Sequence, residues 1–182
     1  SNLAKGAGIK VENVFSFNMS KNTKKANAAF TGLGKTKRII LGDTLLNDYT
    51  KDEIETVIAH ELGHYKHKHI IKNLIFGTVA SFLTFFIISL LYKNSLNWFD
   101  FESITQVAAL PLFSLWAMII GLIQSPIGNI LSRKYEYEAD RYAIESTLKP
   151  ESFIKTLNKL TDQNLGDREP HPFVEWFFYS HP

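Results

Sequence analysis

Hydrophobic and polar positions along the first third of the chain change from strand-like to helical spacing. Residues 9–17 and 26–41 are rich in β-branched and aromatic side chains, and Gly32 and Gly34 interrupt the second block. This pattern predicts a strand followed by a β-hairpin. From residue 51 the apolar positions recur at helical spacing, and Thr50 with Glu53 has the form of a capping box. We therefore expect a helix over 51–69.

Two long uncharged runs follow. Residues 74–92 form a run of 19, which as a helix would extend about 28 Å and match the hydrocarbon core of a bilayer. Residues 107–123 form a second run of 17, with Pro111 near its start, where a helix tolerates proline. Two buried core helices would give similar runs, but their near-spanning length favours a two-helix transmembrane hairpin within residues 73–131.

Charge around these runs predicts their orientation. Basic residues gather at the two outer flanks, whereas the intervening loop has one lysine against two acids. The basic residues are Lys66, Lys68 and Lys72 before the first run and Arg133, Lys134 and Arg141 after the second. The loop holds Lys93, Asp100 and Glu102. By the positive-inside rule both outer flanks are cytoplasmic. We expect an integral membrane protein whose two outer flanks, with any active site that they carry, face the cytoplasm. The membrane would be the endoplasmic reticulum of a eukaryote or the inner membrane of a bacterium. The net charge of +2 gives no reason to expect nucleic acid as a partner.

The last third has helical and irregular parts. Residues 132–148 form a polar helical pattern, Pro150 opens another helix with one apolar face, and the aromatic stretch from residue 162 to the end is predicted to be irregular. The expected organisation is an α+β domain in two parts, 1–72 and 132–182, with the membrane hairpin of 73–131 inserted between them.

One short motif carries specific chemistry. His60-Glu61-Leu62-Gly63-His64 has the form H-E-x-x-H on a predicted helix, where residues i and i+4 lie about 6 Å apart on one face. Two imidazoles at that spacing can share one zinc ion, and Glu61 can take a proton from a zinc-activated water as general base. The chain has no cysteine, so only histidines and carboxylates remain as strong ligands.

A third zinc ligand is expected on the acidic helix after the second run. Glu136 and Asp140 are again i and i+4, so one face could present Glu136 to the metal and Asp140 to the second nitrogen of a ligating histidine. Glu138 points elsewhere on this helix. A solvated acidic helix would show the same residues. An even number of spans, however, returns both halves of the site to one side of the membrane.

These motifs resemble the Ste24 type of the M48 metallopeptidases, the CAAX prenyl protease family. The matching segments cover most of the chain: Ser20-Lys21, Ala26 to Gly32, Lys37 to Leu41, Asp43 to Leu46, His60 to His64, Ser132 to Asp140, Asn164-Leu165 and Tyr179 to Pro182. The resemblance implies that Glu136 is the glutamate ligand and that Asn27, Ala28 and Ala29 border the cleft and bind substrate. It also implies that His181 lies near the active site, where it could stabilise the oxyanion.

The sequence as a whole indicates a membrane zinc endopeptidase with a gluzincin-like core and one zinc ion per chain, acting on peptide or protein substrates. That these substrates include prenylated C-terminal CAAX peptides is what the resemblance implies, because no residue in the sequence identifies a lipid pocket. Two alternatives remain open: a quality-control protease of the HtpX type, and a non-catalytic zinc-binding membrane protein. For Arg133 a structural role is favoured over binding of a substrate carboxylate. Three other histidines are expected at the surface rather than among the ligands: His67, His69 and His171.

Overall fold

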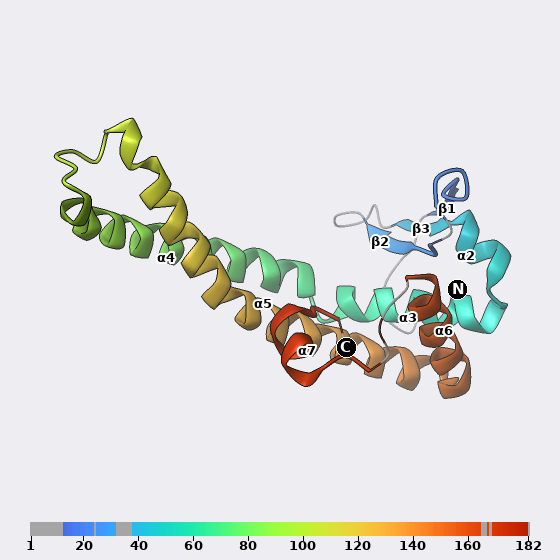
Figure 1. Ribbon diagram of the computed structural model, residues 1–182. Helices are drawn as coiled ribbons and strands as arrows, with labels where there is room; N and C mark the ends of the chain where they lie inside the picture. The colour runs from blue at the N-terminus through green and yellow to red at the C-terminus, as the bar shows by residue number, and fades with distance from the viewer. Residues whose placement is uncertain (1–12, 24, 32–37, 165–166, 168, 182) are drawn as a thin grey trace. The chain divides into compact units, whose positions relative to one another are not determined.

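The computed structural model describes residues 13–23, 25–31, 38–164, 167 and 169–181 (Figure 1). These residues form two compact units. The first unit is drawn from residues 1–69 and 134–171, and the second from residues 70–133 and 172–181. Most of the described chain is helical, and the strands all belong to the first unit.

A small sheet lies at the start of the first unit. Its strands are β1 (Asn13–Phe17), β2 (Ala28–Thr31) and β3 (Arg38–Gly42), in the order β1-β3-β2. β2 runs antiparallel to β3, as the predicted hairpin requires, and β1 runs parallel to β3. Residues 9–12 of the predicted first strand and residues 32–37 of the hairpin lie outside the described chain. Within the described sheet β2 is an edge strand, because β3 is its one strand partner.

Helices pack against the sheet and against one another in the first unit. α2 (Asp43–Asp48) follows β3 directly, and Leu45 and Tyr49 join the buried side chains of β3 in one core cluster. α3 (Lys51–Lys66) begins at the predicted capping box: the Glu53 N–H donates to the Thr50 hydroxyl, and the Thr50 N–H donates to the Glu53 carboxylate. α6 (Pro150–Gln163) packs on α3 through Phe153.

The expected helix over 51–69 is wrong at its end, because α3 stops at Lys66. Lys68 adopts a left-handed backbone conformation with φ of 57°, and α4 (His69–Ser95) begins at the next residue. A left-handed residue cannot continue an α-helix, so the two helices are separated by a sharp turn.

The second unit holds a helical hairpin. α4 leads through two short 3₁₀ helices, Leu96–Phe99 and Val107–Ala109, into α5 (Leu110–Thr147). Within this unit the Trp116 indole donates to the Ser95 hydroxyl at 2.9 Å, and the Gln124 amide donates to the Thr84 hydroxyl at 2.6 Å. Both α4 and α5 are long and apolar enough to cross a membrane, and almost none of their apolar window is buried within the structure.

In the last third, the structure joins two predicted helical segments and corrects one expectation. The second apolar run and the polar pattern of 132–148 are one continuous helix, α5, which contains Pro126 in its interior. A single proline costs a helix one hydrogen bond, and membrane helices tolerate it better than soluble ones. The aromatic stretch expected to be irregular contains α7 (Pro172–Phe178), which starts with proline at a position that suits its fixed φ.

Candidate metal centre

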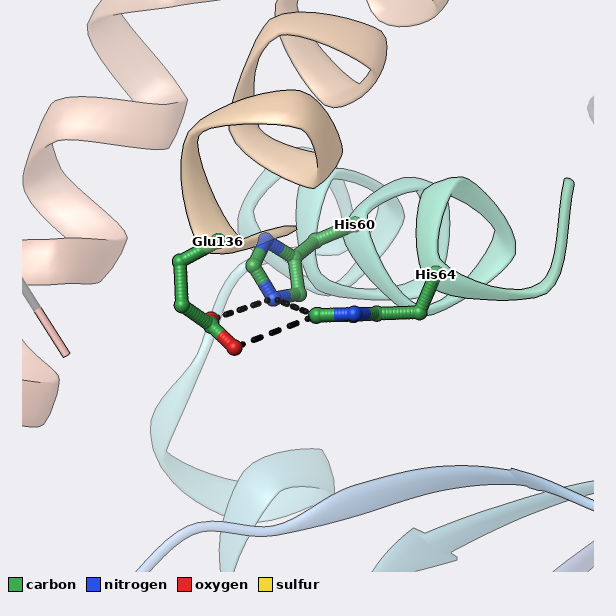
Figure 2. Close-up of side chains that lie close together, drawn as sticks. All are labelled: His60, His64 and Glu136. Carbon is green, nitrogen blue, oxygen red and sulfur yellow. Dashed lines mark hydrogen bonds and ion pairs between the residues drawn. The ribbon is translucent and has the colours of Figure 1, made fainter. Parts of the chain in front are cut away.

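The two histidines of the motif project from the same face of α3. Their Nε2 atoms lie 3.0 Å apart, and both side chains are about four-fifths buried (Figure 2). The capping box at Thr50 fixes where α3 starts, and the i, i+4 spacing then places the two rings one above the other.

Glu136 on α5 completes the group. Its carboxylate oxygens lie 3.4 Å from Nε2 of His60 and 3.6 Å from Nε2 of His64 (Figure 2). Ligand atoms around a tetrahedral zinc ion are about 3.3 Å apart, given zinc–ligand distances near 2.0–2.1 Å. The three donor atoms therefore have the spacing, and the two-nitrogen, one-carboxylate chemistry, that fit a zinc ion.

A close helix crossing brings α5 to α3 at this point. Gly63 is buried, and a Cβ atom added to it would lie 2.9 Å from the Cα of Ala139 and 3.1 Å from the Ala139 carbonyl oxygen. Because no side chain separates the two backbones here, Glu136 can reach the histidines from the neighbouring turn of α5.

Asp140 lies on the far side of the first histidine. Its Oδ1 atom is 2.8 Å from Nδ1 of His60, the ring nitrogen that does not face Glu136. Burial of the ring disfavours its charged form, but hydrogen bonds to Asp140 and Glu136 outweigh this and raise the pKa of His60 to about 9. A metal ion at the centre would take the place of that proton.

Glu61 lies beside the group without belonging to it. Burial raises the pKa of its carboxyl group, while His60, His64 and a hydrogen bond from the Phe30 backbone act in the opposite direction. A carboxylate whose pKa is raised is a better proton acceptor, and this suits Glu61 to accepting and returning a proton. Phe30 belongs to β2, so this edge strand reaches the carboxylate of the motif.

The residues expected to bind substrate lie at the same strand. Ala28 and Ala29 belong to β2, and Asn27 precedes it with its carbonyl accepting a hydrogen bond from the Gly42 N–H at 2.9 Å. β2 also packs on α3, where the rings of Phe30 and Tyr65 meet edge to face at 5.0 Å. Their role in binding stays a prediction.

The remaining candidates are His181, Arg133 and three other histidines. His181 is exposed and belongs to the second unit, so its catalytic role stays a prediction. Arg133 donates hydrogen bonds to the carbonyl oxygens of Glu175 and Tyr179 and so anchors the segment around α7. His171 is exposed and His67 partly buried, but the expectation of a surface position is wrong for His69, which is only 2% exposed.

Comparison with known proteins decides the family. The sequence profile of peptidase family M48 matches residues 1–182. The chain belongs to peptidase family M48. This M48 chain is 37% identical over 184 residues to the "uncharacterized metalloprotease YhfN" of Bacillus subtilis, covering 99% of this chain and 43% of that one. It is 34% identical over 198 residues to CAAX prenyl protease 1 of Saccharomyces cerevisiae, covering 99% and 44%.

A solved structure agrees with these relatives. The crystal structure of S. mikatae Ste24p matches with a TM-score of 0.83 at 32% identity, over 100% of this chain and 46% of that one. The resemblance to the Ste24 type is thus confirmed. The M48 chain spans less than half the length of these three relatives.

Proposed function

We propose that this M48 chain is the catalytic region of a membrane-embedded, zinc-dependent endopeptidase of the CAAX prenyl protease type, with a gluzincin-like core. The observation that carries the proposal is the convergence of His60, His64 and Glu136, whose ligand atoms all lie within 4.8 Å of one another. Glu61 beside them supplies a general base, which a structural zinc site would not need.

Each residue has a distinct task in peptide hydrolysis. A zinc ion held by His60, His64 and Glu136 would act as a Lewis acid towards the scissile carbonyl and an attacking water. Glu61 would accept a proton from that water and deliver it to the leaving amine. Asp140 would hold the His60 ring in the tautomer whose Nε2 is free to bind metal, because its carboxylate faces Nδ1. His181 is proposed to stabilise the oxyanion.

The edge strand β2 supports a role in substrate binding. An extended peptide can add to an unpaired strand edge through backbone hydrogen bonds, and β2 lies on α3 next to Glu61. We therefore propose that Asn27, Ala28 and Ala29 bind the substrate backbone. Because the Saccharomyces cerevisiae relative of this chain is named CAAX prenyl protease 1, prenylated C-terminal peptides are the proposed substrates.

α4 and α5 are proposed to cross the lipid bilayer. Both helices are long and apolar enough to span a membrane. A hairpin of two spans returns the chain to the side of the membrane from which it came. The excess of lysine and arginine at the outer flanks supports a cytoplasmic site.

Three variants of the full-length, detergent-solubilised protein test the proposal. Glu61→Gln should keep one zinc ion and lose about 10²–10⁴-fold in peptide cleavage, because it retains the shape of the side chain without the base. Glu136→Ala should lose zinc, whereas the matched control Glu145→Ala, an exposed glutamate later on α5, should keep both zinc and activity.

The readouts are zinc content and mass-spectrometric cleavage of matched farnesylated and unmodified peptides. Equal cleavage by wild type and Glu61→Gln would refute the mechanism. Zinc retained in Glu136→Ala would refute the ligand set, and equal rates on both peptides would refute the preference for prenylated substrate.

A further inference from the structure

His69 is a buried histidine that contacts the second histidine of the motif. Its Nδ1 atom lies 2.9 Å from Nδ1 of His64, and its Nε2 atom lies 3.0 Å from Oε2 of Glu138. Its ring stacks on Tyr135 with centroids 4.3 Å apart and planes 13° from parallel. Each ring nitrogen of His69 thus has a defined partner, and only 2% of the residue is exposed.

The turn between α3 and α4 creates this contact. On one continuous helix, residues five apart are rotated by about 140° from each other, so His69 would point away from His64. The left-handed Lys68 interrupts the helix instead, and its N–H donates to the Tyr65 carbonyl. The chain folds back over its last turn and returns His69 to the ring of His64.

The contacts allow one consistent arrangement of hydrogen atoms. If the Nε2 lone pair of His64 is directed to the metal, the hydrogen of a neutral ring lies on Nδ1 and is donated to Nδ1 of His69. His69 must then carry its own hydrogen on Nε2, which faces a carboxylate oxygen of Glu138. Glu138 therefore fixes the tautomer of His69, and His69 fixes the tautomer of His64.

We propose that His69, held by Glu138, is a positioning residue that orients His64 for metal binding. It does for the second histidine what Asp140 does for His60, and the inference rests on the zinc site of the proposed function. Both halves of the H-E-x-x-H pair are then oriented from α5, by Asp140 and by Glu138 through His69. Such outer partners set metal affinity by holding the ligand ring in place.

A second metal site is the competing interpretation. Ligand atoms of His67, His69 and Glu138 also lie within 4.8 Å of one another. A metal ion there would need a lone pair of His69. Taking Nδ1 would break the contact with His64, and taking Nε2 would break the contact with Glu138. The paired arrangement already satisfies both nitrogens, so positioning is favoured.

The test is zinc affinity of the full-length protein, measured by chelator competition at pH 7, with the visible spectrum of the Co²⁺-substituted protein as a second readout. His69→Phe keeps a ring against Tyr135 and removes both nitrogens. It should bind zinc about 10–100-fold more weakly and alter the Co²⁺ spectrum, with an unfolding temperature close to that of wild type. Glu138→Ala, which leaves His69 itself intact, should weaken zinc binding in the same direction.

His67→Phe is the matched control, because His67 stacks on His69 with ring centroids 5.6 Å apart and a phenyl ring can keep that stacking. This variant should leave affinity and spectrum unchanged. Zinc affinity of both His69→Phe and Glu138→Ala within twofold of wild type would overturn the inference. So would two zinc ions in wild type that fall to one in His67→Phe. A wild type that binds no zinc would instead overturn the proposed function.

Discussion

Gly63 offers the sharpest test of how the centre is held together. Alanine at this position would place its Cβ 2.9 Å from the Cα of Ala139, 3.1 Å from the Ala139 carbonyl oxygen and 3.2 Å from the Cβ of Tyr142. Ordinary carbon contacts are about 3.5–4.0 Å, so α5 must retreat from α3 by about 0.5–1 Å. Since two of the three contacts are backbone atoms, no side-chain rotation relieves them.

The energetic terms for Gly63→Ala oppose each other. Alanine is better than glycine inside a helix by about 1 kcal/mol, whereas overpacking costs about 1–3 kcal/mol. We therefore expect a loss of only about 0–2 kcal/mol in the free energy of unfolding. The centre should suffer far more, because Glu136 moves with α5, and a misplacement near 1 Å costs about 10²-fold in rate. Zinc affinity should fall by at least about tenfold.

The assay compares chelator-competition zinc affinity, peptide cleavage and thermal unfolding in the same preparations. Gly77→Ala on α4 is the control, because a Cβ there meets no atom of the described chain within 4 Å. Adding Ala139→Gly to Gly63→Ala should not rescue activity, since the clashing atoms are the Cα and carbonyl of that residue. Wild-type zinc affinity and cleavage in Gly63→Ala would refute the idea that this crossing sets the ligand geometry.

Three further predictions concern other contacts. Asp140→Ala should weaken zinc binding about 10–100-fold, measured by chelator competition, while circular dichroism shows that the helical fold is kept. Unchanged zinc affinity would contradict the proposed role of Asp140. The pKa of Glu53 is lowered, because hydrogen bonds from the Lys159 ammonium and from the backbone at the start of α3 outweigh the effect of burial. The ionised Glu53 therefore stabilises the fold fully above the pKa of the unfolded state, and this contribution is lost as pH falls through the pKa of the folded state. Glu53→Gln should cost about 1–3 kcal/mol at pH 7 and flatten the fall in stability between about pH 5 and 3 in denaturant titrations; a parallel fall in both proteins would count against this. Gln124→Leu removes a hydrogen bond to Thr84 inside the apolar hairpin and should cost only about 0.6–1.7 kcal/mol in steric-trap or denaturant unfolding, so a larger loss would show that the pair does more than join the two helices.

Short sequence patterns predicted correctly the features that depend on interactions between residues close in the chain. The capping box needs only Thr50 and Glu53 at fixed spacing, and the structure forms both of its hydrogen bonds. The i, i+4 rule likewise predicted that His60 and His64 would share one face. The approach of Glu136 and Asp140 to these histidines is a contact across about 80 residues. It could be anticipated because carboxylates recur at helical spacing after an even number of spans, and because the family resemblance implies that Glu136 is a ligand.

The features that the sequence did not reveal depend on backbone geometry. Lys68 gives no compositional indication of a left-handed turn, so the sequence predicts a helix that continues to residue 69 and a surface position for His69. The relation between His69 and Glu138 follows from that turn, and a histidine five residues after the motif was the one available hint. Similarly, the sequence analysis did not reveal that one helix runs through Pro126, because a long apolar helix absorbs one missing hydrogen bond.

If β2 binds substrate as proposed, the length of this edge strand has a consequence for which substrates can bind. β2 is four residues long, so it offers about 13 Å of backbone to a partner strand. A chain segment docked there must be fully extended with its own backbone groups unpaired, which a helix or an internal sheet strand cannot provide. A disordered terminal segment would meet this requirement directly, whereas a folded region would first have to unfold locally, which costs free energy. The strand would thereby select unfolded over folded substrate segments, independently of the side chains that the substrate carries.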